Sequence, residues 1–302
     1  MSSRNDEVRE FLSTRRAKIT PQAAGLPAYG GKRRVKGLRR EEVALLAGIS
    51  ADYYTRLEKG RLTGVSDGVL GAIAGALRLD EAERTYLFDL ARTANAGVVR
   101  NRRPAAAKIR PEVQRVLDSM ITAAACVCNG RLDIIGTNLL ARALYSPAFD
   151  SPARSTPLAP PNIARFNFLD PNSPAFYPDF NEAENTAVQL LRAQAGRTPY
   201  DKQLTDLIGE LTTRSESFAH RWASHDVRVY RTGLKRFSHP VVGEIAVSYE
   251  AMELLADEGL TMMTYTAEPG TADDERLRLL ATWATTERAD LGGEKPIRHH
   301  RA

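Results

Sequence analysis

Residues 38–61 read LRREEVALLAGISADYYTRLEKGR and hold two short apolar stretches on either side of one glycine. Apolar residues recur at helical spacing over residues 39–47, which predicts a first helix. Gly48 ends this helix, because a residue without a Cβ atom adopts the left-handed backbone of a sharp turn at little cost. Ser50 is a favourable N-cap for a second helix, which reaches about residue 59. The stretch therefore predicts two short helices joined by a tight turn.

Two helices joined in this way form a helix-turn-helix, which places the start of its second helix against base edges in the major groove of DNA. Residues at the start of the first helix and after the second contact phosphates, so we expect Arg40 and Arg61 to do so. Arg56 is predicted to bind guanine through two hydrogen bonds, a contact worth ~1–3 kcal/mol of discrimination. The full set of predicted DNA-binding residues is Arg39, Arg40, Ser50, Ala51, Asp52, Tyr53, Arg56 and Arg61. A helical hairpin that only packs a core is the alternative, which the arginines at both ends disfavour.

The longer run LPAYGGKRRVKGLRREEVALLAGISADYYTRLEKGR resembles the N-terminal half of the MmyB-like transcription regulators. Its helix pair resembles the helix-turn-helix of the lambda repressor/Cro family, also called the XRE (xenobiotic-response-element) family. The similarity continues through ARFNFLDP, LIGELTTRS, WASHDVR, KRFSHPVVGEI and YTAEPG, so it covers nearly the whole chain. The resemblance implies a sequence-specific regulator of transcription that carries a C-terminal sensor domain of the PAS type.

Charge is distributed unevenly along the 302 residues, which are enough for two domains of ordinary size. Residues 1–110 hold 22 Lys+Arg against 12 Asp+Glu, a net charge of +10, whereas the rest hold 20 against 25, a net charge of −5. The basic part is therefore expected to bind double-stranded DNA. The chain has neither an apolar signal segment nor a run of apolar residues long enough to cross a membrane, so we expect a cytoplasmic protein.

The first part of the chain is predicted to be an all-α, five-helix domain like that of lambda repressor. Its expected helices cover residues 4–16, 39–47, 50–59, 66–77 and 80–94. Residues 19–37 are rich in Gly and Pro and form a loop, in which Lys32, Arg33 and Arg34 either contact DNA or remain solvated. The predicted division of the chain is a DNA-binding domain at 1–100, a linker at 101–110, a second domain at 111–285 and a polar tail at 286–302.

The second domain is predicted to be α+β, with one antiparallel sheet and helices against one face. Expected strands cover residues 123–130, 131–138, 225–240, 242–254 and 260–270, with Asn129-Gly130 as a hairpin turn. Expected helices cover residues 111–121, 139–145, 181–195, 201–214 and 273–284. Residues 146–180 are expected to be a long loop rich in proline and aromatic side chains. This order resembles a PAS-like domain, which is the fold that the family resemblance implies.

A sheet backed by helices and an aromatic loop can enclose an apolar ligand. Phe166 and Phe168 of ARFNFLDP share a face if that segment is extended, while Phe218, Trp222 and His225 share one face of a helix. Packing of these aromatic side chains in a core is the alternative. The family resemblance implies a ligand-binding module that has been associated with fatty-acid-like ligands. The predicted ligand-binding residues are Asn138, Arg165, Phe168, Trp222 and His225.

One departure from the family concerns the residue before Asn138. Many members carry an aromatic residue there, whereas this chain has Thr137, so the pocket wall is expected to be smaller at that point.

Catalysis is the competing class of function. No glycine-rich phosphate loop follows a strand and no spacing of metal ligands occurs, so we expect no metal and no cofactor. Cys126 and Cys128 lie one residue apart on a predicted strand, which favours two reduced, partly buried thiols over a disulfide. His225 and Asp226 could pair with a nucleophile such as Ser238, but nothing in the sequence brings these residues together. We therefore expect a protein that is not an enzyme.

The predicted function is sequence-specific, DNA-binding regulation of transcription, controlled by a small apolar, fatty-acid-like ligand in the C-terminal domain. A homodimer is expected, because two half-sites one helical turn apart, ~34 Å, supply the affinity that one helix-turn-helix lacks. Two alternatives remain: a C-terminal domain that only dimerises and binds no ligand, and, more remotely, an enzyme in that domain.

Overall fold

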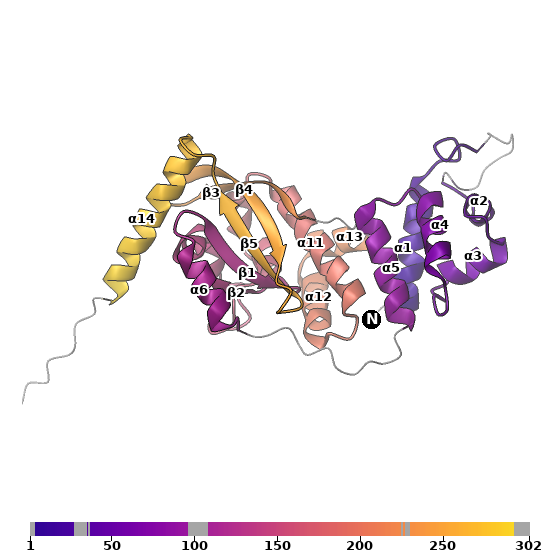
Figure 1. Ribbon diagram of the computed structural model, residues 1–302, viewed down its shortest axis with the longest axis horizontal. Coiled ribbons are helices and arrows are strands. Elements are labelled where there is room, and N and C mark those ends of the chain that lie inside the picture. The colour runs from indigo at the N-terminus through magenta and orange to yellow at the C-terminus, as the bar shows by residue number, and fades with distance from the viewer. Residues whose placement is uncertain are drawn as a thin grey trace, which may run out of the picture. The chain divides into compact units, whose positions relative to one another are not determined.

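The structure is a computed structural model that describes residues 4–26, 35, 37–95, 108–224, 226 and 230–292 (Figure 1). The chain forms two compact units, each built from two stretches of sequence. The first, here called the helical unit, comprises Met1–Arg102 and Val188–Val229. The second, here called the sheet unit, comprises Arg103–Ala187 and Tyr230–Ala302.

Five helices open the helical unit in the predicted order. They are α1 (Arg4–Lys18), α2 (Arg40–Leu46), α3 (Ala51–Glu58), α4 (Asp67–Ala76) and α5 (Glu81–Asn95). Each contributes apolar side chains to one shared core, whose largest fully buried members include Phe11, Leu12, Tyr54, Leu57 and Tyr86. The all-α five-helix prediction is confirmed.

The turn between α2 and α3 forms as the sequence predicts. Gly48 has a φ of 64°, in the left-handed region that favours glycine. Its backbone N–H donates to the Leu45 carbonyl at 3.2 Å, and the Ile49 N–H donates to the Ala44 carbonyl at 3.0 Å. These two bonds satisfy carbonyls at the end of α2 and fix the angle at which α3 begins.

The described residues of the helical unit form three further helices. They are α11 (Phe180–Arg197), which enters this unit at Val188, together with α12 (Lys202–Arg214) and α13 (Glu216–Ala223). The Thr93 hydroxyl of α5 donates to the Gly196 carbonyl of α11 at 3.1 Å. Arg192 of α11 is fully buried and pairs with Glu7 of α1. Polar contacts thus join helices that lie about a hundred residues or more apart in sequence.

Five strands form a single antiparallel sheet in the other unit. They are β1 (Ala124–Asn129), β2 (Ile134–Thr137), β3 (Thr232–His239), β4 (Gly243–Glu253) and β5 (Leu260–Thr266), in the spatial order β2-β1-β5-β4-β3. Strand β5 is central, and its Met263 lies opposite Cys126 of β1. The predicted α+β class with an antiparallel, PAS-like sheet is confirmed.

Helices cover both faces of the sheet, in contrast to the prediction of one covered face (Figure 1). Apolar residues of α6 (Pro111–Ser119) pack on Ala125 and Val127 of β1. The opposite face carries α7 (Leu139–Leu144) and α14 (Ala272–Gly292), which bury the alternate strand residues Ala124 and Cys126. Because successive strand side chains point to opposite faces, the apolar run in β1 needs cover on both sides.

The predicted long loop at residues 146–180 contains three short helices. They are α8 (Ser146–Phe149), α9 (Ile163–Leu169) and α10 (Ser173–Phe176). The extended form expected for ARFNFLDP is therefore wrong, because Asn162 caps α9 by accepting a hydrogen bond from the Arg165 N–H at 2.9 Å. In the described part of the chain, no helix is long and apolar enough to cross a membrane.

Candidate DNA-reading surface and ligand-binding module

The start of α3 is fixed by its cap. The Ser50 hydroxyl accepts a hydrogen bond from the Tyr53 N–H at 3.1 Å. Ala51 and Asp52 follow on the first turn and are exposed, while Tyr53 is half-buried against the core. The predicted groove-facing residues at the start of α3 thus lie on a surface that is open to solvent, except for the inner side of Tyr53.

Arg56 lies one turn further along α3 and is exposed. Its guanidinium carbon lies 5.3 Å from the centroid of the Tyr53 ring. A guanidinium at this distance is attracted to the negative face of the ring, by roughly 0.5–1 kcal/mol at an exposed site. The contact restricts Arg56 to fewer rotamers, which lowers the entropy that the side chain loses when it binds a base edge.

Arg40, a predicted phosphate contact, also belongs to an ion-pair cluster. Its guanidinium pairs with Glu58, whose side chain is 1% exposed, whereas that of Arg40 is 49% exposed. Arg16 of α1 binds the same carboxylate from the other side, with 2.8 Å between its Nε and Glu58 Oε1. The three side chains carry a net charge of +1, so the cluster stays attractive to a phosphate. Sequence reasoning missed Arg16 and Glu58, because their 42-residue separation gives no local signal.

Arg39, a predicted DNA-binding residue, and Arg61, the second predicted phosphate contact, differ in how they are held. The Arg39 backbone N–H donates to Glu42 Oε2 at 2.6 Å, and its side chain pairs with Glu41 at 3.3 Å. Arg61 is exposed just after α3, and among the described residues its side chain has no ion-pair partner. The predicted loop contacts at residues 32–34 lie outside the described residues.

Asn138, the first predicted ligand contact, is buried and makes four hydrogen bonds to the backbone. Its Nδ2 donates to the carbonyls of Met120 and Ala123, each at 2.7 Å. Its Oδ1 accepts from the N–H groups of Ala125 and Ala141 at 3.1 and 2.8 Å. The amide therefore joins the end of α6, the start of β1 and the first turn of α7, and a ligand would have to replace one of these bonds.

Arg165 and Phe168 both lie on α9 and are half-buried. Residues two apart on a helix point to different sides, so Phe168 does not share the face of Phe166. Phe166 is 1% exposed and belongs to the core on the inner face of the sheet, the face covered by α7 and α14.

Trp222 lies in the helical unit, whereas the other three described candidates lie in the sheet unit. Its ring stacks on Phe218, with centroids 5.5 Å apart, and the Arg192 guanidinium carbon lies 4.0 Å from the ring centroid. The predicted helical spacing of Phe218 and Trp222 is confirmed, and both pack against neighbouring groups of the same unit. His225 lies outside the described residues.

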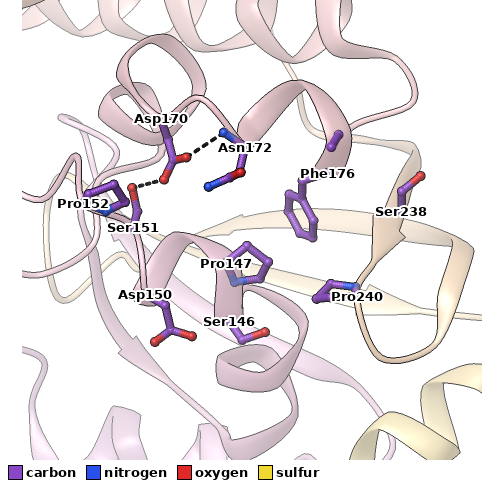
Figure 2. A pocket seen from close by; sticks show the side chains of 11 residues that line it. Ser146, Pro147, Asp150, Ser151, Pro152, Asp170, Asn172, Phe176, Ser238 and Pro240 are labelled. Carbon is purple, nitrogen blue, oxygen red and sulfur yellow. Dashed lines mark hydrogen bonds between the residues drawn. The ribbon is translucent and has the colours of Figure 1, made fainter.

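The sheet unit has a surface pocket of about 470 Å³ that none of the predicted ligand residues lines (Figure 2). Its lining residues come from α8 and the segment after it, from the α9–α10 connection and α10, and from the end of β3 and the β3–β4 turn. Asp170 lies at one side, where it accepts hydrogen bonds from the Ser151 hydroxyl and, at 2.8 Å, from the Asn172 N–H. The ring of Phe176 forms the apolar wall (Figure 2). Sequence reasoning missed this pocket, because it assigned the segment to an irregular loop.

A five-helix bundle with an exposed and arginine-flanked α3, combined with a separate antiparallel-sheet unit, defines the class of helix-turn-helix DNA-binding regulators. Comparison with known protein families supports this assignment. The model of the MmyB-like transcription regulator ligand binding domain matches residues 109–280, more than half of the chain. A helix-turn-helix domain model matches residues 14–87. The chain belongs to the MmyB-like transcription regulators. Among curated proteins, none shows significant sequence similarity to the chain.

Proposed function

We propose that this DNA-binding transcription regulator reads its operator with α3 and that an apolar, fatty-acid-like molecule in the sheet unit controls it. The observation that carries the first half of this proposal is the exposed Arg56, oriented by Tyr53 and flanked by basic side chains at both ends of the helix pair. The family match supports the second half, since more than half of the chain matches a ligand-binding module.

Loss of a base contact and loss of a phosphate contact should change DNA binding in different ways. Arg56→Ala is expected to relax the preference for one base pair, at a cost of ~1–3 kcal/mol on the preferred sequence. Arg61→Ala is expected to weaken binding to all sequences about equally and to reduce the salt dependence of binding by about one phosphate contact. Arg214→Ala, at an exposed position on α12, removes the same charge elsewhere in the helical unit and serves as the control.

The experiment selects operator DNA from a random library and then measures affinity by fluorescence anisotropy at several salt concentrations. If Arg56→Ala and Arg61→Ala change affinity and specificity in the same way, α3 is not the reading helix.

We also propose that the protein acts as a dimer, since two half-sites one turn of DNA apart supply the affinity that one α3 lacks. Native mass spectrometry of the purified full chain tests both assembly and ligand. A dimer mass with an added apolar molecule that can be extracted after denaturation supports the whole proposal. A dimer that stays empty when fatty acids are added leaves dimerisation as the role of the sheet unit.

A further inference from the structure

Lys235 lies on β3 and carries an amine toward the core of the sheet unit. It is directly opposite Val247 of β4 and two residues before Phe237, both of which are completely buried. Side chains in these positions share one face of a sheet. Lys235 is itself half-buried, and its ammonium group lies near aromatic rings of this core.

Three aromatic rings surround this ammonium group. Its nitrogen lies 5.5 Å from the ring centroid of Tyr145, 5.1 Å from that of Tyr177 and 5.3 Å from that of Phe237. These rings come from the end of α7, the end of α10 and β3 itself. Cation–π attraction to the rings partly replaces the water that the ammonium group loses.

Hydrogen-bond donors outnumber acceptors around Lys235. Lys235 Nζ donates to Tyr145 Oη at 3.2 Å, and the Tyr145 and Tyr265 hydroxyls are 2.7 Å apart. If the Tyr145 hydroxyl donates this hydrogen bond to Tyr265, the Tyr265 hydroxyl can still donate its own hydrogen to another acceptor. The buried hydroxyl of Tyr177 has no hydrogen-bond partner among the described residues. Among the described residues, two N–H groups of the ammonium and the hydroxyls of Tyr177 and Tyr265 can therefore still donate to an acceptor.

No carboxylate in the described part of the chain lies within ion-pair distance of Lys235; Glu182 of α11 acts on it only from further away. Burial lowers the pKa of Lys235 to about 8, while Cys126 and Cys128 of β1 and Glu182 oppose that shift. Hydrogen bonding to Cys128 and burial raise the pKa of the Cys126 thiol, which is therefore neutral near pH 7. Burial also raises the pKa of Tyr145, Tyr177 and Tyr265. At neutral pH, Lys235 is thus a cation with no anion at ion-pair distance among the residues that the structure describes.

We propose that Lys235, together with the hydroxyls of Tyr177 and Tyr265, binds the carboxylate of an apolar acid. A carboxylate only accepts hydrogen bonds, which matches the excess of donors, and its charge compensates the buried cation. This inference rests on the proposed ligand-binding function and specifies the polar end of the ligand.

Phe176 connects this cluster with the pocket of Figure 2. Its ring forms a wall of the pocket and also lies 5.2 Å from Phe237 and 4.8 Å from Tyr177, centroid to centroid. Phe176 thus lies against both the pocket and the rings around Lys235. In the proposed complex, the Phe176 ring turns aside, the apolar tail fills the pocket and the carboxylate reaches Lys235.

The test compares decanoate with decanol, a neutral alcohol of the same chain length, by isothermal titration calorimetry on the delipidated full chain. Lys235→Met is expected to weaken decanoate binding by roughly 10- to 100-fold, the usual effect of losing a hydrogen-bonded charge, and to change decanol binding by less than about threefold. Lys202→Met, at a highly exposed position on α12, is expected to change neither.

A second measurement needs no variant. Decanoate affinity of the wild type is expected to be constant below pH 7 and to fall above pH 8, approaching tenfold per pH unit, because the amine must first take up a proton. Decanol affinity should not change over this range, and calorimetry in two buffers should show proton uptake with decanoate alone.

Two results would overturn the inference in distinguishable ways. Equal binding of decanoate and decanol, unaffected by pH or by Lys235→Met, would retain an apolar ligand site but refute the carboxylate site at Lys235. If neither compound binds and no molecule is extracted from the purified protein, the proposed ligand-binding function fails together with the inference.

Discussion

Replacing Lys235 by methionine should stabilise the sheet unit at neutral pH. The folded protein lowers the pKa of this amine from 10.5 to about 8, so it holds the proton less tightly than the unfolded chain does. A tenfold change in proton affinity corresponds to ~1.4 kcal/mol, which makes the cost of keeping Lys235 charged roughly 3 kcal/mol at most. Lys235 is only half-buried and the variant loses the Tyr145 contact, so we expect a gain of ~1–2 kcal/mol.

The dependence on pH has a definite sign. Between about pH 8 and 10.5 the unfolded chain carries a proton on Lys235 that the folded chain lacks, so stability rises with pH in this window. Below pH 8, Lys235 is protonated in both the folded and the unfolded chain, so the folded wild type bears the full free-energy cost of keeping this amine charged. The stabilising effect of Lys235→Met should therefore be largest near pH 7 and shrink as the pH approaches 10.

Urea unfolding followed by Trp283 fluorescence measures this effect. Trp283 packs against the core of the sheet unit, and Trp222→Phe makes it the sole tryptophan of the chain. Lys202→Met in the same background controls for the loss of a lysine, since its side chain is 89% exposed. If Lys235→Met lowers stability equally at pH 7 and pH 10, the amine does not bear a burial cost, and the argument for a missing anion fails with it.

Three further predictions concern the helical unit, with thermal or urea unfolding as the measurement. Glu58→Gln leaves two arginines without their shared carboxylate and should cost ~3–5 kcal/mol; a cost below about 1 kcal/mol would mean that the ion pairs are not formed. Ser50→Ala removes the cap of α3 and should cost about 1 kcal/mol, with a parallel loss of DNA affinity. Gly196→Ala places a Cβ atom 2.5 Å from Cε2 of Tyr86 and should cost ~1–3 kcal/mol, whereas Gly209→Ala on α12, which meets no atom, should gain up to ~1 kcal/mol. Equal effects of the two glycine substitutions would show that α11 does not pack on α5.

Local sequence signals predicted most of the secondary structure. Gly48 and Ser50 mark the turn and the cap of the helix pair, and both act as expected because each works through bonds to residues within four positions. The alternation of side chains in β1 likewise follows from strand geometry alone. Phe166 and Phe168 were predicted to share a face because the segment was treated as extended. The segment is instead the helix α9, whose N-cap is Asn162.

Long-range partners were beyond sequence reasoning. The pairing of Arg16 with Glu58 and the position of Lys235 beside Tyr145 join residues far apart in the chain, and no spacing rule connects them. Lys235 also sits in a strand that reads as alternating polar and apolar residues, in which a lysine is ordinarily assigned to solvent. Its register opposite Val247 and its contact with Tyr145 show that it faces the core.

The helical unit is built from two separate stretches of sequence, which limits where the chain can be cut into independent parts. Residues 188–229 pack with residues 1–102, so the helices that stabilise the DNA-reading bundle are encoded within the ligand-binding family match. A chain truncated after residue 102 would expose Tyr86 and leave Arg15 and Asp89 without their partners in the later segment. Exchange of sensor modules between such regulators would then require the recipient to supply compatible counterparts of α11, α12 and α13. Recombination at the junction near residue 102 alone would yield a bundle that lacks part of its own scaffold.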